Sequence, residues 1–199
     1  ALAWFGVSFI FPDWKFRRLS RTINRSLTAQ CNYLAEVAEQ YKYGRNNGLK
    51  YRVIRRAAHN NDAEVASLIS TLATEPDFDP TQKTLAFEFL CLNHTLLSYI
   101  AALGAHREKI EDQEVLTLLD LAVENIQGSL LKDEAPDLNA QNMLDTIRQR
   151  LSSNNKDDQK ALIVLQQLSL MLSILNQLSR LKQSLSHDRD DKATELASL

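Results

Sequence analysis

Apolar residues recur along most of this chain at spacings of three and four, which is the period of an amphipathic α-helix. In the stretch 13–43, for example, apolar positions follow one another at Leu19, Ile23, Leu27 and Cys31. No segment keeps the strict alternation of apolar and polar residues that a half-buried strand requires. The pattern predicts helices over 13–43, 49–74, 81–108, 112–133, 138–152 and 156–186.

Turn and capping residues fall between these helices. Gly44 and Gly48 bracket a loop, Pro76 closes the second helix, and Pro136 interrupts the chain before the fifth. A capping residue followed by a proline in the first turn is typical of a helix start. Asp79 and Pro80 form such a pair at the start of the third helix. The sequence therefore predicts an all-α fold, a bundle of about six helices.

The third predicted helix is apolar on nearly all sides between Leu85 and Ala105. Its length alone would allow it to span a membrane. However, Glu88, Asn93 and His94 lie close together within it, and each would cost free energy in lipid. We therefore expect the central helix of a soluble bundle, with neighbouring helices on most of its sides.

The first eleven residues are uncharged and mostly apolar, and the basic residues that precede a secretory signal's apolar core come after them instead. As a helix they would rise about 16 Å, roughly half the thickness of a bilayer's hydrocarbon core. We expect residues 1–11 to be the end of a transmembrane helix cut from a longer chain. The alternative is an apolar arm that packs on the core of the domain itself.

Aromatic and basic residues follow this apolar stretch. Tryptophan rings suit the headgroup region of a membrane, and an excess of Lys and Arg is typical of the cytoplasmic end of a membrane span. We therefore expect a membrane interface, then a cytoplasmic helical bundle over 12–187 and a polar C-terminal tail over 188–199. The residues expected at the interface are Trp14, Lys15, Arg17, Arg18 and Arg21.

The composition agrees with a folded helical protein. Of the 199 residues 44% are hydrophobic and 24% charged, which argues against wholesale disorder. The five Gly and four Pro are too few for the many turns of an all-β fold. Both cysteines, Cys31 and Cys91, lie within apolar helical patterns, so we expect buried thiols in a reducing compartment.

Charge is divided unevenly along the chain. Residues 1–56 carry eleven Lys/Arg against three Asp/Glu, whereas the remaining residues carry twelve against twenty-two. A basic front part points to an anionic neighbour, either a phospholipid surface or nucleic acid. Because its basic residues interleave with an apolar stripe and no helix-turn-helix spacing is present, we favour lipid and expect no nucleic-acid partner.

The sequence carries few signs of catalytic chemistry. It contains none of the spaced motifs of di-metal bundles, zinc proteases, phosphate-binding loops or serine hydrolases. A metal site could be drawn from His59, Asp62, Glu64 and His94, but their spacing is not that of metal ligands. We therefore expect no enzyme, no catalytic residue, no metal and no cofactor.

Polar residues crowd the second predicted helix and recur in the third. Arg55 and His59, for example, are four apart and share a face. Such residues could form a solvated face or contact an anion, but we favour a polar network that joins the helices. The residues expected in this network are Arg55, Arg56, His59, Asn60, Asp62, Asn93, His94, His106 and Arg107.

Three segments carry a resemblance to a known family. Residues 51–63 read YRVIRRAAHNNDA, residues 87–107 contain FEFL, LNHTLLSYI and GAHR, and residues 12–18 read PDWKFRR. With these segments the chain resembles the C-terminal cytoplasmic domain of bacterial inner-membrane proteins of the YccS/YhfK-type FUSC (fusaric acid resistance-like) family. The resemblance implies a longer parent protein with membrane helices, and relatives that are linked to efflux of small aromatic carboxylic acids.

Two functional hypotheses follow. The first is a cytoplasmic accessory or regulatory domain of an inner-membrane transporter, on the cytoplasmic side of a bacterial inner membrane. Its partners would be the lipid membrane and the rest of the same polypeptide, with a homo-oligomer as a further option. The alternative is a freestanding all-α protein-interaction module with an apolar N-terminal arm.

Overall fold

The computed structural model describes residues 13–45, 48–76, 78–132, 138–153 and 159–187. The side chains of residues 13–17, 138–140, 153 and 187 fall outside this description. The expectations for residues 1–11 and for the tail over 188–199 therefore concern residues that lie outside the described part of the chain.

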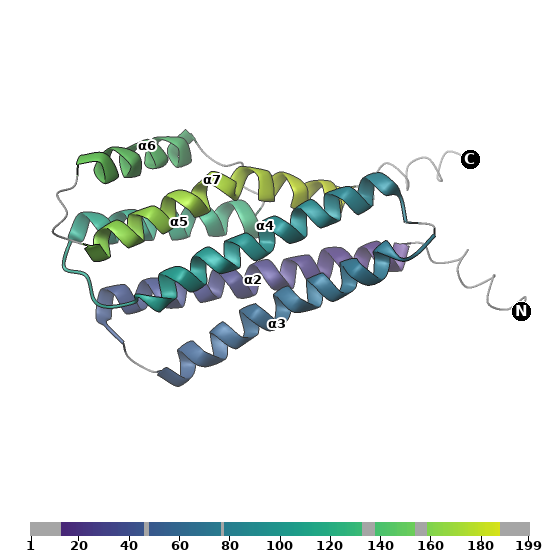
Figure 1. Cartoon of the computed structure of the whole chain (residues 1–199), viewed down its shortest axis with the longest axis horizontal. Coiled ribbons are helices and arrows are strands. Elements are labelled where there is room, and N and C mark those ends of the chain that lie inside the picture. Colours follow the sequence, from purple (N-terminus) through teal and green to yellow (C-terminus); the bar gives the residue numbers. More distant parts are fainter. Residues whose placement is uncertain (1–12, 46–47, 77, 133–137, 154–158, 188–199) are drawn as a thin grey trace, which may run out of the picture.

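The described residues form six α-helices and no strand, which confirms the all-α bundle (Figure 1). The bounds of each helix differ from the predicted ones by at most three residues, which is little more than the usual uncertainty in where a helix ends. The helices are α2 (Asp13–Tyr43), α3 (Gly48–Ala73), α4 (Pro80–Ala105), α5 (Gln113–Leu131), α6 (Leu138–Ser153) and α7 (Gln159–His187).

Helix α2 lies inside the bundle. It packs against α3, α4, α5 and α7, whereas α6 packs on α7 and α5 at the outside (Figure 1). The apolar stripe of α2 explains this position, because Leu19, Ile23, Leu27 and Leu34 are all fully buried. Burying such side chains supplies most of the favourable free energy of folding. The helix that directly follows the apolar first residues is thus, with α7, one of the two helices that pack against most of the others.

Helix α4 was expected to be a central helix with neighbours on most of its sides, and this holds in part. It packs against α2, α3 and α7, but its remaining side is exposed to solvent. The polar residues Glu88, His94 and Ser98 lie on this exposed side together with the apolar Phe87 and the thiol of Cys91. Of the three polar residues singled out in the sequence, Asn93 alone is buried.

The two cysteines also differ from expectation. Cys31 on α2 is buried, and burial raises the pKa of its thiol to about 12, while Lys182 opposes that shift. Cys91 on α4 is exposed, contrary to the prediction of a buried thiol. The reason is that Cys91 shares the exposed side of α4 with His94 and Ser98, which are three and seven residues further along the helix.

Two described helices, α4 and residues 159–186 of α7, are long and apolar enough to cross a membrane by length and composition. Both also contribute to the common core, where Phe89 of α4 and Leu168 of α7 are fully buried. They pack against each other along the bundle. Their apolar character is thus used in packing between helices.

Candidate functional site

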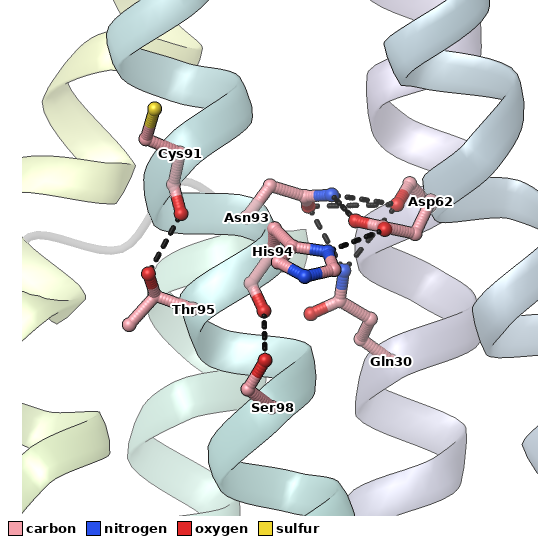
Figure 2. A network of polar contacts seen from close by, with 8 residues as sticks. Gln30, Asp62, Cys91, Asn93, His94, Thr95 and Ser98 are labelled. Carbon is pink, nitrogen blue, oxygen red and sulfur yellow. Dashed lines mark hydrogen bonds and ion pairs between the residues drawn. The ribbon is translucent and has the colours of Figure 1, made fainter.

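A buried polar cluster joins α2, α3 and α4 near the middle of the bundle (Figure 2). The Asp62 carboxylate of α3 accepts a hydrogen bond from Asn93 Nδ2 at 2.7 Å through Oδ1, and its Oδ2 lies 2.9 Å from His94 Nδ1. Asn93 is completely buried and Asp62 is 7% exposed. A carboxylate that is so little exposed to solvent is tolerated because each of its two oxygens has a polar partner.

Two side chains of α2 complete the cluster. Gln30 Nε2 donates to Asn93 Oδ1 at 3.0 Å, and Asn93 Nδ2 lies 3.2 Å from Ser26 Oγ. Ser26 and Gln30 are four residues apart and fully buried, so they present one polar patch to α4. Asn93 therefore connects α2 to α3 through its two ends, and we call these five residues, Ser26, Gln30, Asp62, Asn93 and His94, the Asn93 cluster.

The outer rim of the Asn93 cluster faces solvent. The side chain of His94 is 68% exposed while its Nδ1 contacts Asp62. His59, one turn before Asp62, has its pKa lowered by partial burial and by the nearby Arg55 guanidinium. The arrangement can position helices and hold a proton at its rim, but it presents no nucleophile next to a base.

A second polar cluster lies where α4 ends. The hydroxyl groups of Tyr33 and Tyr51 are 2.9 Å apart, and Tyr51 Oη donates to the Gly104 carbonyl oxygen at 3.4 Å. The Arg107 guanidinium stacks 3.7 Å above the ring of Tyr51 and donates from Nε to Gln40 Oε1 at 2.7 Å. These contacts hold the turn after α4 against α2 and α3. We call the five residues that make them, Tyr33, Gln40, Tyr51, Gly104 and Arg107, the Tyr51 cluster.

The nine residues expected in one polar network are divided by the structure. Asp62, Asn93 and His94 come together, with His59 beside them, whereas Arg107 belongs to the Tyr51 cluster. The others lie on exposed surfaces, and His106 serves as the C-terminal cap of α4. The exposed members are Arg55, Arg56, Asn60 and His106.

The sequence contained a signal for two residues that we did not expect. Ser26 and Gln30 stand on the apolar side of α2, between Ile23, Leu27 and Leu34, so two polar residues interrupt an otherwise apolar stripe. A polar pair with that spacing is typical of a buried contact to another helix. Tyr33 and Tyr51 gave no such signal, because tyrosine is common in any partly buried position.

Two of the expected membrane-interface residues have described side chains. Arg18 and Arg21 are exposed on the first turns of α2. The side chains of Trp14, Lys15 and Arg17 fall outside the described ones, although their backbone is part of α2. The backbone of α2 thus continues as one helix from Asp13 into the bundle.

A search for groups of three or more His, Cys, Asp and Glu side chains that could hold a metal ion finds none among the described residues. His59 and Glu64, two members of the set considered above, are both exposed, and Glu64 pairs with Arg25.

Comparison with known proteins gives three relatives. The chain is 42% identical over 187 residues to "Inner membrane protein YccS" of Escherichia coli, which covers 94% of this chain and 26% of that protein. It is 37% identical over 112 residues to an uncharacterised protein of Haemophilus influenzae, covering 56% of this chain and 16% of that protein. A Neisseria gonorrhoeae protein, "Uncharacterized protein ORF2", is 33% identical over 119 residues, or 59% of this chain and 28% of that protein.

No family model and no solved structure matches the chain. The chain spans about a quarter of the length of the Escherichia coli relative, so the similarity concerns one part of a larger protein. Because the match includes nearly the whole chain at 42% identity, the expected resemblance to a YccS-type protein is confirmed. The chain is therefore a YccS-type domain, similar to a domain-sized stretch of an inner membrane protein.

Proposed function

We propose that this domain is a cytoplasmic accessory domain of an inner-membrane transporter, and that α2 links it to the membrane part of the same polypeptide. Three observations support the proposal: the similarity to an inner membrane protein, the apolar residues 1–11, and the basic residues that follow them. An excess of Lys and Arg next to an apolar segment is typical of the cytoplasmic side.

The position of α2 carries this proposal. It directly follows the apolar segment in sequence, and it packs against α3, α4, α5 and α7. A displacement at its first turns would therefore be felt by most of the bundle. Packed helices shift as rigid elements and transmit small movements over tens of ångströms.

The two polar clusters fix α2 against its neighbours. Gln30 and Ser26 bind Asn93 of α4, which in turn binds Asp62 of α3. Near the C-terminal end of α2, Gln40 accepts from Arg107 and Tyr41 Oη donates to the Leu103 carbonyl at 2.8 Å. Directional hydrogen bonds at the middle and at the C-terminal end of α2 resist sliding of this helix along α3 and α4 more than apolar packing alone would.

In this proposal the transporter exports small aromatic carboxylic acids, as the family resemblance implies, and the domain supports transport without catalysis or a cofactor. Its partners are anionic lipid headgroups, the membrane helices of the same polypeptide and, where the transporter is oligomeric, a second copy. The basic residues Lys15, Arg17, Arg18 and Arg21 contact the headgroups, together with Trp14.

The sidedness can be tested with the full-length membrane protein, because Cys91 is exposed and Cys31 is buried with a raised thiol pKa. A membrane-impermeant maleimide of high mass should leave Cys91 unlabelled in intact spheroplasts. It should label the same residue in inverted inner-membrane vesicles. The thiolate is the reactive form, so Cys31 should remain unlabelled in both preparations.

The matched control is Cys91→Ser, which identifies the labelled band whatever other cysteines the full-length protein contains. Labelling of Cys91 in intact spheroplasts would place the domain on the periplasmic side and contradict the proposal. Recovery of the labelled protein in the soluble fraction would instead support the freestanding interaction module.

A further inference from the structure

A polar groove of about 680 Å³ runs along the exposed side of α2 where α3 lies beside it. It is separate from both polar clusters, since none of its lining residues belongs to either. Ala29 is its one apolar lining residue. The groove is lined by Ser20, Arg21, Asn24, Arg25, Thr28, Ala29 and Asn32 of α2 and by Asn61 of α3.

Two guanidinium groups of this groove are available to a ligand. Arg21 makes no hydrogen bond or ion pair with any residue that the structure describes. Arg25 has one ion pair, from Nη1 to Glu64 Oε1 at 3.3 Å, with side chains 59% and 45% exposed. An exposed, single-pronged pair of this kind contributes little and is readily exchanged.

The spacing of these two residues favours one shared ligand group. Arg21 and Arg25 are four apart, so their side chains project from the same face of α2, about 5–6 Å apart at Cβ. A planar carboxylate offers two oxygens and satisfies one guanidinium fork. A tetrahedral phosphate offers oxygens in more than one plane and can bind both.

The rest of the lining favours a hydrophilic ligand. Asn24, Asn32 and Asn61 present carboxamides, and Asn61 uses only its Nδ2, which donates to the Ala57 carbonyl at 2.8 Å. Asn is a poor helix former at exposed positions, so three such residues along one groove are not explained by helix stability. A pocket that retains an aromatic ligand is predominantly apolar, and this one is not.

We propose that this groove binds the phosphate group of a hydrophilic ligand through Arg21 and Arg25, with the asparagine carboxamides binding neighbouring hydroxyl groups. This site goes beyond the proposed accessory function, with which it shares Arg21. At 1.5 Å per residue, Arg25 and Asn32 lie about 18 Å and 29 Å along α2 from Asp13. A ligand from solution reaches the whole groove, whereas a lipid headgroup near Asp13 would reach only its first part.

The test uses the 199-residue chain in a nonionic detergent, with sn-glycerol 3-phosphate as the probe and isothermal titration calorimetry as the measurement. Saturable binding is expected, and Arg21→Gln should weaken it about tenfold, the loss expected for a hydrogen-bonded charge pair. Arg56→Gln removes the same charge from an exposed position of α3 outside the groove and should leave the affinity unchanged. Circular dichroism and the melting temperature check that each variant is folded.

Glu64→Gln should change the affinity for the probe in the opposite direction from Arg21→Gln. Removing the carboxylate that competes for Arg25 should tighten probe binding about two- to fivefold, in line with the small contribution of an exposed pair. Succinate, with the same formal charge but planar carboxylates, should bind at least tenfold more weakly than the phosphate probe.

Two further outcomes decide between sources of the phosphate. Saturable binding of free sn-glycerol 3-phosphate supports a soluble ligand, whereas binding only to phosphatidylglycerol vesicles, lost in Arg21→Gln, assigns the phosphate to a lipid headgroup. Equal losses in Arg21→Gln and Arg56→Gln would show diffuse charge attraction and overturn the site. Absence of binding both to sn-glycerol 3-phosphate and to phosphatidylglycerol vesicles would overturn the site as well. So would succinate binding as tightly as sn-glycerol 3-phosphate.

Discussion

Asn93 is the residue on which the contacts of the Asn93 cluster depend. Its side chain binds Asp62 on one helix and Gln30 and Ser26 on another, and it is inaccessible to solvent. An amide is suited to this position because it donates and accepts at once. Each neighbour would be left without its partner if the amide were lost, and an unpaired buried polar group is costly.

We predict that Asn93→Leu lowers the free energy of unfolding by about 2–4 kcal/mol, because it leaves the Asp62 carboxylate buried with an unpaired oxygen. Urea denaturation of the 199-residue chain measures the change. His94→Gln, at the exposed rim, should cost less than about 1 kcal/mol. A smaller loss for Asn93→Leu than for His94→Gln would show that the cluster does not stabilise the fold.

Gly104 is required by close packing at the end of α4. A Cβ at this position would lie 2.8 Å from Tyr51 Oη and 2.9 Å from Tyr33 Oη, and both tyrosines are buried. We predict that Gly104→Ala lowers the free energy of unfolding by about 1–3 kcal/mol, the usual cost of overpacking. Thermal melting measures this change.

Gly48→Ala is the control for Gly104→Ala, since nothing lies within 4 Å of a Cβ built there. That substitution should be neutral or slightly stabilising, because alanine is the better helix former. If Gly104→Ala melts at the wild-type temperature, the Tyr51 cluster is looser than the contacts indicate.

At the level of helices, one acidic residue links two elements. Asp112 caps α5 by accepting from the backbone N–H groups of Glu114 and Val115, and it pairs with Arg150 of α6 at 2.8 Å. Partial burial raises the pKa of Asp112, but the hydrogen bonds from Val115, Arg150 and Glu114 lower it more, so its pKa lies below the ordinary value of 3.8.

The lowered pKa gives a pH-dependent prediction. The stability from ionised Asp112 is complete above the pKa of the unfolded chain, near 3.8, and is lost as the pH falls through the lower folded-state value. Asp112→Asn keeps a good capping residue but loses the charge. It should destabilise the chain at pH 7, and the difference from wild type should shrink between about pH 4 and pH 2.

Asp145→Asn is the matched change for Asp112→Asn, since among the described residues Asp145 pairs only with Arg148 of the same helix, at 3.5 Å. The unfolding free energy of the Asp145→Asn variant should stay within about 0.5 kcal/mol of wild type at both pH 7 and about pH 2. A difference for Asp112→Asn that persists unchanged at pH 2 would indicate that the charge of Asp112 plays no part.

The first turns of α2 give a prediction about membranes. Replacing Lys15, Arg17 and Arg18 with Glu should weaken binding to vesicles that contain anionic lipid, because each basic residue near such a surface contributes about 1 kcal/mol. Raising the salt concentration should weaken the wild-type interaction in the same direction. Vesicle co-sedimentation measures both effects.

The control reverses three exposed arginines of α3, Arg52, Arg55 and Arg56, which changes the net charge equally. In the structure these residues belong to the end of α3 that is far from Asp13 (Figure 1). Equal weakening by the two triple variants would show that the first turns of α2 have no particular role at the lipid surface.

The helices themselves could be predicted well from sequence, and their packing only in part. Period and capping residues fixed all six to within a few residues, because these signals are local. Which helices have the most neighbours depends on contacts between distant segments, so the apolar α4 was expected at the centre, although α2 and α7 pack against more helices than α4 does. Likewise, Asp62, Asn93 and His94 were expected together, but Arg107 was assigned to them although its partners are Tyr51 and Gln40.

At the scale of the whole molecule, charge and architecture point in the same direction. The basic residues that follow the apolar segment lie at the start of α2, and the chain is similar to about a quarter of an inner membrane protein. In the proposed function, the continuity of α2 from Asp13 into the core is what allows the domain to affect transport.

The most direct measurement of that claim is export of a radiolabelled small aromatic carboxylic acid from cells that carry the full-length protein. Replacing Lys15, Phe16 and Arg17 with glycine weakens the helix by about 1 kcal/mol per residue. These residues precede Leu19, which is the first buried residue in the described part of α2. Replacing the same three residues with alanine removes the side chains but keeps the helix. We predict that the glycine variant, inserted at wild-type levels, loses export to the level of cells lacking the protein, while the alanine variant retains most of it. Export by the glycine variant at the wild-type rate would contradict the account.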